Sequence, residues 1–320
     1  MGKLERGQLH ALYSDVVRGY SRGTSEVFGR FFIKHFRSFD FSEIEAEKEK
    51  HLSHARRSGL KTITEAEEEA IKKGFWSPEK EKEISQTRIF VDNLILTKKK
   101  SVLKTQIDAL NEEIKKTETK LKNLEAEKEE IIGYCADHFA NKKITEFYIR
   151  ISMFNDVEFR EPVFSQETFE SVNEKELEHL TVVYNHCTDK FNSNILKQVA
   201  LTPAFLNGFY LCKNNPFSFY GKPIIELSTY QVELFGYGIY FKNIFADGKD
   251  SIPDDIRDDP EALVEWYDSH QNAEKILEKT KGREGGAVAI VGASAEDRKR
   301  LGLDGKTIDF STEAQNTVGV

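Results

Sequence analysis

Proline, cysteine and long apolar runs are all scarce in this chain, and each scarcity narrows the kind of protein it encodes. Only 7 of the 320 residues are proline and 20 are glycine, so helices can run far without a breaker. The 3 cysteines, Cys135, Cys187 and Cys212, are too few and too widely spaced for a disulfide framework, so we expect reduced thiols and an intracellular protein. The most apolar window, residues 196–212, contains Lys197 and is too short and too polar to span a membrane.

A surplus of basic residues is also missing. The formal net charge is −8, which argues against general nucleic-acid binding, because that function needs an excess of Lys and Arg. Charged residues make up 31% of the chain, more than the usual share of about 25%, and this favours long solvated helices. No apolar stretch follows Met1, so we expect no signal peptide. No catalytic signature and no cofactor motif emerges, and we expect a protein that is not an enzyme.

The residues that are present predict a mainly α fold with N-terminal short helices, a long coiled-coil segment, an aromatic-rich helical core and a short extended C-terminal tail. Residues 1–78 form the N-terminal helical region. Ser42 and Thr64 each precede a glutamate by three residues, the pattern of a capping box, and Ser77-Pro78 is typical of a helix start. Six side chains recur at helical spacing in this region: Phe28, Phe31, Phe32, His35, Phe36 and Phe39.

Residues 79–154 contain no proline and a single glycine, Gly133, and predict a long helix with a coiled-coil seam. Apolar positions alternate in steps of four and three, as in a heptad repeat. The seam residues are Leu103, Ile107, Leu110, Ile114, Leu121, Leu124 and Ile131, with Leu96 before them and the polar Thr117 and Lys128 among them. A long helix against the protein's own body is the simpler alternative. A hairpin that turns at Thr97–Ser101 and a dimer remain equally open.

Residues 155–246 predict the aromatic helical core. Start signals at Ser165, Asn173, Thr202-Pro203 and Ser228 open successive helices, and a loop is expected over residues 214–223. The last helix is apolar nearly all round, so it should be central. We expect Phe209, Tyr220, Tyr230, Phe235 and Phe241 to form one core, and Gly236 and Gly238 to admit another element closely.

Residues 247–320 predict an acidic linker, a short helix that starts at Asp259-Pro260, and a flexible tail that binds a partner. An isolated apolar strand is unstable in water, so the tail should dock on the protein's own body, on a second copy or on another protein's sheet edge. The candidate contact residues are Val288, Ile290, Val291, Leu301, Ile308 and Phe310.

Three weaker signals favour simple structural explanations. Gly305-Lys306-Thr307 ends like a phosphate-binding loop, but Arg300 stands where that motif needs glycine. The pairs Cys135 with His138 and His186 with Cys187 supply metal-ligand types without the usual zinc spacing, so no metal is expected. The basic runs Arg56-Arg57 and Lys98–Lys100 are typical of solvated helix faces, although either could contact nucleic acid or an acidic partner.

Two stretches resemble uncharacterised proteins of large bacteriophages with contractile tails. One is Gly74-Phe-Trp76-Ser-Pro78 with the following coiled coil and Ile132-Gly-Tyr-Cys-Ala-Asp-His138; the other runs from Asn215-Pro216 through Tyr220-Gly221-Lys222-Pro223 to Tyr240-Phe241-Lys242. The resemblance covers roughly residues 60–310, including the tail. It implies a tail or baseplate assembly or structural protein. Such a protein contacts other phage proteins, associates with itself through the coiled coil, and resides in the host cytoplasm or the virion. A nucleic-acid-associated coiled-coil protein is the alternative.

Overall fold

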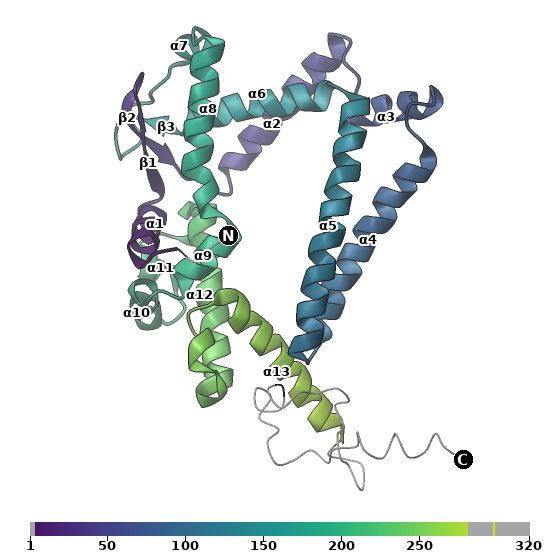
Figure 1. Ribbon diagram of the computed structural model, residues 1–320. Coiled ribbons are helices and arrows are strands. Elements are labelled where there is room, and N and C mark those ends of the chain that lie inside the picture. Colours follow the sequence, from purple (N-terminus) through teal and green to yellow (C-terminus); the bar gives the residue numbers. More distant parts are fainter. Residues whose placement is uncertain (1–3, 281–296, 298–320) are drawn as a thin grey trace, which may run out of the picture. The chain divides into compact units, whose positions relative to one another are not determined.

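The computed structural model describes residues 4–280 and Asp297. Over these residues the chain is mainly helical, as the sequence predicts (Figure 1). It divides into two compact units, and each unit combines segments that are distant in the sequence. Among the described residues, the first unit holds residues 4–72 and 132–243, and the second holds residues 73–131, 244–280 and Asp297. This division differs from the four consecutive segments expected above.

The first unit contains most of the helices and a small sheet. Its helices are α1 (Arg6–Arg18), α2 (Asp40–Arg57), α3 (Ile63–Lys72), α6 (Ala136–Ser152), α7 (Gln166–Glu170), α8 (Glu174–Thr188), α9 (Ser193–Ala200), α10 (Pro203–Leu211), α11 (Pro216–Tyr220) and most of α12 (Thr229–Gly248). The strands are β1 (Tyr20–Ser25), β2 (Gly29–Lys34) and β3 (Met153–Phe154), in the order β1-β2-β3 with antiparallel neighbours.

The helix expected over Phe28–Phe39 is wrong, because these residues form strand β2 and the turn before α2. β1 pairs with β2 from Tyr20 opposite Lys34 to Ser25 opposite Gly29. Side chains along a strand alternate between its two faces, and here Phe31 and Ile33 are each only 1% exposed.

Two glycines explain why a hairpin forms in this segment. Gly29 has a φ of 69°, a conformation that glycine adopts without strain in a tight turn. A Cβ at Gly23 would lie 2.1 Å from the Phe31 ring, so only glycine fits beneath that side chain. The spacing of the aromatic residues in this segment fits both a helix and a strand. The two glycines favour the strand pair.

The inner face of the β1–β2 strand pair packs on α6 and α8. One buried cluster joins the three elements: Phe31, Ile33, Ile149, Met153, Phe164, Leu180 and Cys187. A second cluster joins α2 to α6, which lie side by side in Figure 1, through Ile44, Ile144 and Phe147. These contacts tie the N-terminal residues to a segment more than a hundred positions away.

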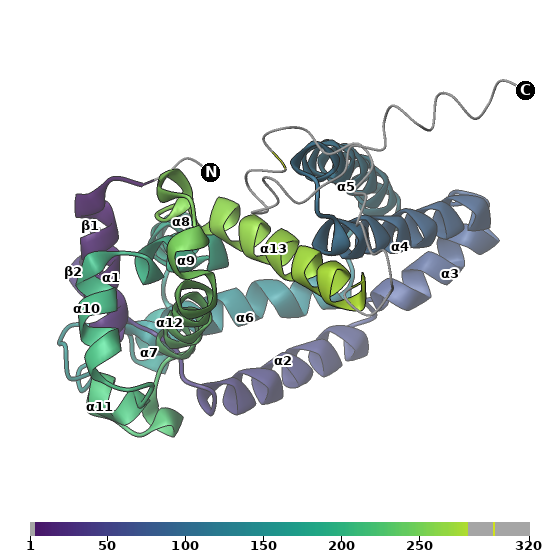
Figure 2. The same cartoon turned by 90° about the horizontal axis from the view of Figure 1, so that it is seen from below.

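The aromatic core forms around α10 and α12, which lie beside each other in Figure 2. Phe209, Phe235 and Phe241 are 0%, 6% and 0% exposed, so the expected burial of these rings is confirmed. The Phe209 and Phe235 ring centroids lie 5.1 Å apart, and Tyr220 lies 6.1 Å from Phe235. Tyr230 instead stacks on Phe191 at 4.9 Å.

Most of the predicted helix starts are confirmed. The side chains of Ser77, Ser165, Asn173, Thr202 and Asp259 each accept a hydrogen bond from an amide of the helix they precede. Ser228 and Gln231 form the expected reciprocal pair.

Two predicted starts are displaced. Thr62, rather than Thr64, forms the capping box of α3 with Glu65. α2 already begins at Asp40, and the Ser42 hydroxyl, two positions inside it, donates to the Phe39 carbonyl.

The second unit contains α4 (Pro78–Lys100), α5 (Lys104–Ile132), α13 (Pro260–Thr280) and the end of α12. The helical segment predicted over residues 79–154 is interrupted twice, so that it forms α4, α5 and α6, and the first interruption lies next to the turn that the hairpin alternative placed at Thr97–Ser101. The first break follows Ser101, whose backbone is extended. The second break occurs at Gly133, whose φ of 70° ends a helix in the left-handed conformation.

Candidate functional site

Burial along α5 follows the heptad seam. Leu103, Ile107 and Thr117 are 3%, 2% and 7% exposed. Four further seam residues are half-buried, namely Leu110, Ile114, Leu121 and Leu124. Ile131 is 36% exposed, so the covered stripe ends before it.

α4 supplies the matching stripe through Ile84, Thr87 and Val91, which are 3%, 8% and 7% exposed. Leu96, which the sequence analysis placed at the head of the seam, is 51% exposed and faces away from it. We call α4 and α5 together the hairpin, and Figure 1 shows them running antiparallel beside each other. The sequence left two arrangements open, a hairpin within one chain and a dimer. The described residues form the hairpin within one chain.

Ion pairs flank the stripe between the two helices. They join Lys80 to Glu127, Arg88 to Glu125, Lys120 to Glu83 and Lys128 to Glu81. The Trp76 indole donates to the carboxylate of Glu81 at 3.1 Å. Burial alone would raise the pKa of Glu81, but the hydrogen bonds from Lys128 and Trp76 outweigh it and hold that pKa below its usual range.

The basic run at the tip of the hairpin is engaged by α13. Lys98 Nζ lies 2.6 Å from Glu265 Oε1, and Asn272 donates to the Lys99 carbonyl at 2.7 Å. Burial raises the pKa of Asp268, and the charges of Lys99 and Lys98 oppose that rise. The Lys98 side chain and the Lys99 backbone therefore contribute to holding α13 against the hairpin.

The first unit exposes a group of large apolar side chains that the sequence analysis assigned to the core or to a loop. They come from 23 consecutive positions, and we call them the 210–232 cluster: Tyr210 (45% exposed), Leu211 (84%), Phe217 (58%), Ile224 (63%), Ile225 (66%) and Val232 (40%). Large exposed apolar side chains are candidates for an interaction site, and these six come from one short segment of the chain. The sequence signal was the run of aromatic residues in the loop expected over residues 214–223.

Local structure fixes the backbone beneath this cluster. The expected loop over residues 214–223 contains the short helix α11, and Asn215 caps it by accepting from the amides of Phe217 and Ser218. The Tyr220 hydroxyl donates to the Gln231 carbonyl at 3.0 Å, and the Phe219 ring lies 5.4 Å from that of Phe205. The inner aromatic residues of the segment thus anchor it, while the outer ones remain exposed.

The two Cys and His pairs lie in separate environments. Cys135 Sγ is 3.0 Å from His138 Nδ1 at the start of α6, whereas Cys187 on α8 contacts the Arg22 carbonyl. Burial raises the pKa of the Cys187 thiol, which keeps it protonated and unreactive. Within the part of the chain that the structure describes, no group of three or more His, Cys, Asp or Glu residues is placed to hold a metal ion.

All six candidate contact residues of the tail, and Gly305-Lys306-Thr307, lie outside the described residues. Asp297 is described and is 2% exposed. Its carboxylate accepts from the Lys104 amide at 2.9 Å, at the first residue of α5. A carboxylate there satisfies a free amide and favours the positive end of the helix dipole, so this position contacts the protein's own body.

Comparisons of the chain with family models, with curated proteins and with solved structures find no match. Among the described residues, no helix combines the length and the apolar character needed to cross a bilayer.

Proposed function

We propose that the chain is a bacteriophage virion morphogenesis protein, either a tail or baseplate assembly factor or a structural component, that acts through protein–protein contacts. In this proposal it performs no catalysis, binds no cofactor, and works in the host cytoplasm or within the particle. The resemblance of residues 60–310 to proteins of contractile-tailed phages supports the phage assignment. The 210–232 cluster carries the proposal that contact with other proteins is its mode of action.

Two properties make this cluster suited to binding. Its six members are exposed by 40% or more, whereas single exposed apolar residues elsewhere need no explanation. Its backbone is already held by the Asn215 cap and the Tyr220 hydrogen bond. Binding would therefore order few groups, and this lowers the entropic cost of association.

The hairpin offers a second contact surface. We propose that α4 and α5 form an antiparallel coiled coil in which the polar seam residue Lys128 fixes the register by pairing with Glu81. Ile89, Phe90 and Leu96 on α4 are 60%, 47% and 51% exposed, and they are suited to contact another helix. Self-association through this face is part of the proposal.

The nucleic-acid alternative receives less support. Lys98 is paired with Glu265, Arg56 is paired with Glu65, and the net charge is −8. The nucleic-acid alternative would be supported if the chain bound duplex DNA with an affinity that falls steeply as the salt concentration rises.

The proposal can be tested by placing a charge in the 210–232 cluster. Affinity capture of the wild-type chain from cells assembling the phage should recover identified tail or baseplate proteins. Leu211→Asp and Ile225→Asp should abolish that recovery without lowering the melting temperature. Val182→Asp on α8 is the matched control, because Val182 is 63% exposed and lies outside the cluster. Equal recovery by all three variants would contradict the assigned surface.

A second measurement separates an assembly factor from a permanent component. Mass spectrometry of purified particles should detect the chain in stoichiometric amounts if it is a component, and should not detect it if it is an assembly factor.

A further inference from the structure

We infer that a polar pocket in the first unit binds a small phosphate ester. The pocket has a volume of about 350 Å³, within the size range of small-molecule sites. Four segments distant in the sequence converge on it, within residues 18–19, 34–37, 154–159 and 222–231, and its charged lining residues are Arg18, Lys34, Arg37, Lys222, Glu158 and Glu226. Four of these side chains are basic and two are acidic, so the lining carries a net positive charge.

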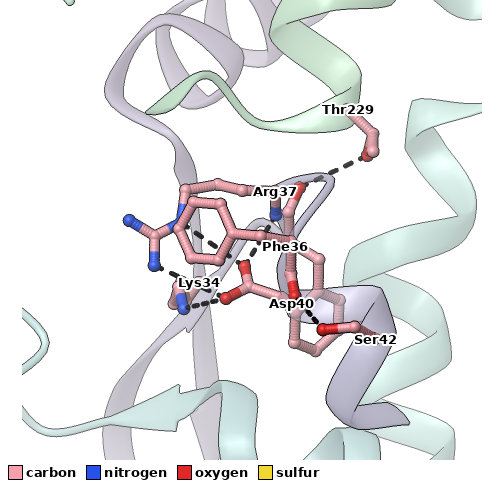
Figure 3. A network of polar contacts seen from close by, with 7 residues as sticks. Lys34, Phe36, Arg37, Asp40, Ser42 and Thr229 are labelled. Atoms are coloured by element: carbon pink, nitrogen blue, oxygen red, sulfur yellow. Dashed lines mark hydrogen bonds and ion pairs between the residues drawn. The ribbon is translucent and has the colours of Figure 1, made fainter. Parts of the chain in front are cut away.

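Asp40 fixes the positions of two of the basic side chains, Lys34 and Arg37. Figure 3 shows the Asp40 carboxylate between Lys34 and Arg37. Lys34 Nζ lies 3.2 Å from Asp40 Oδ1, the Arg37 amide donates to Oδ2 at 2.7 Å, and the Arg37 guanidinium lies 3.4 Å from Oδ1. Burial alone would raise the pKa of Asp40, but these contacts lower it below its usual range. Asp40 therefore remains charged and orients both cations without itself lining the pocket.

The other two cations are available to a ligand. Neither Arg18 nor Lys222 forms a salt bridge or a side-chain hydrogen bond with any residue that the structure describes. Arginine matches phosphate oxygens with two parallel hydrogen bonds, and lysine supplies a compact point charge. Both side chains line the same pocket.

The pocket is formed before a ligand arrives, because backbone contacts connect its walls. The Thr229 amide donates to the Phe36 carbonyl at 2.9 Å, and the Thr229 hydroxyl contacts the same carbonyl (Figure 3). The Gln231 side chain donates to the Val17 carbonyl at 2.9 Å, and the His35 amide donates to the Gly19 carbonyl at 2.9 Å. Groups that are already ordered lose little entropy on binding.

One wall is aromatic, which favours an organic phosphate over inorganic phosphate. The Phe154 and Phe159 rings lie 5.3 Å apart. Phe159 has a φ of 59°, a conformation that is strained for a bulky residue. Asp156 accepts three backbone amides of the same loop and so holds Phe159 there. The carboxylates of Glu158 and Glu226 can accept hydrogen bonds from hydroxyl or amino groups of the ester.

Titration calorimetry on the full chain tests the inference with three probes: inorganic phosphate, ribose 5-phosphate and adenosine 5′-monophosphate. At least one ester should bind saturably and at least tenfold more tightly than inorganic phosphate. Tighter binding of the nucleotide, reduced by Phe159→Leu, identifies a base on the aromatic wall. Equal binding of the two esters identifies a sugar phosphate.

Arg18→Gln and Lys222→Gln should each weaken ester binding at least tenfold. The matched controls are Arg6→Gln, at the other end of the same helix, and Lys175→Gln on α8, and neither should change it. Circular dichroism confirms that each variant is folded. The inference is overturned if neither ester binds at millimolar concentration, if inorganic phosphate binds as tightly, or if the control variants weaken binding as much as the pocket variants.

Discussion

The hairpin and the α10–α12 segment bury apolar side chains in opposite ways. In the hairpin, one row of side chains per helix is covered, and several members such as Leu110 and Leu124 remain half-buried. Around α12, the rings of Phe205, Phe209 and Phe241 are 0% exposed and form a core several side chains thick. The hairpin therefore depends on many small contributions, and the aromatic core depends on a few large ones.

The two regions also differ in their polar groups. Ion pairs such as Lys120 with Glu83 lie at the hairpin surface, where each contributes about 0–1 kcal/mol. The aromatic core instead encloses uncharged polar groups, among them the Gln231 side chain bonded to Ser228. A single substitution should consequently affect the aromatic core more than the hairpin.

The largest effect is expected for Phe235→Ala. Phe235 is 6% exposed and contacts the rings of Phe209, Phe219 and Tyr220, so its loss should lower the free energy of unfolding by about 3–5 kcal/mol. Chemical denaturation followed by near-ultraviolet circular dichroism measures this. Phe217→Ala, at a residue that is 58% exposed, is the control and should change stability little. Similar losses in both variants would show that burial does not decide the effect.

In the hairpin we expect a smaller and graded response. Ile107→Ala should cost about 2–4 kcal/mol, because Ile107 is 2% exposed. Leu124→Ser should cost about half as much, because Leu124 is only half-buried. Hydrogen exchange of the α4 and α5 amides localises the loss, and Leu96→Ala serves as the exposed control. An unchanged exchange rate in Ile107→Ala would mean that the seam is not a packing surface.

The same contrast explains how much of the fold the sequence predicts. Helix starts and the α5 seam depend on residues within one turn or one heptad, so local patterns identify them. The hairpin of β1 and β2 was missed because its Phe residues fit both periods and the turn at Gly29 decided between them. The exposure of Leu211 and Ile225 depends on which face the rest of the chain covers, and no local pattern contains that.

The phosphate pocket was missed for a similar reason. Arg18, Arg37, Phe159 and Lys222 are separated by up to about two hundred positions, and each alone looks like an ordinary surface residue. Only the packing of α12 against the end of β2, through Thr229 and its neighbours, brings them together. A prediction from one sequence therefore identifies elements more readily than a site built from several of them.

The two glycines of α12 provide a matched pair within the aromatic core. A Cβ at Gly238 would lie 2.7 Å from the rings of both Phe205 and Phe209, whereas nothing lies within 4 Å of one at Gly236. Gly238→Ala should destabilise by about 1–3 kcal/mol through overpacking. Gly236→Ala should stabilise by about 0.5–1 kcal/mol, because alanine is the better helix former. Opposite shifts in melting temperature check this, and shifts of the same sign would contradict the close approach at Gly238.

Acid should also distinguish the aromatic core from the hairpin. His35 is 4% exposed, with Nε2 hydrogen-bonded to Ser21 Oγ at 2.8 Å and the rings of Phe191 and Tyr230 packed around it. Burial among these uncharged groups lowers its pKa to about 3, while the unfolded chain keeps a pKa of about 6.5. Between these two pH values the unfolded state binds more protons than the folded state.

The stabilisation from neutral His35 is therefore complete above pH 6.5 and is lost as the pH falls toward 3, by about 1.4 kcal/mol for each pH unit. His35→Phe removes the titrating group, so its free energy of unfolding should decline less steeply than that of the wild type over this range. Parallel pH profiles would show that His35 is protonated without resistance in the folded protein. Between pH 6.5 and about 5 the α4 and α5 amides should not share this dependence in hydrogen exchange, because the described residues of the hairpin include no histidine and its Glu81, whose pKa is held below the ordinary value, stays charged there.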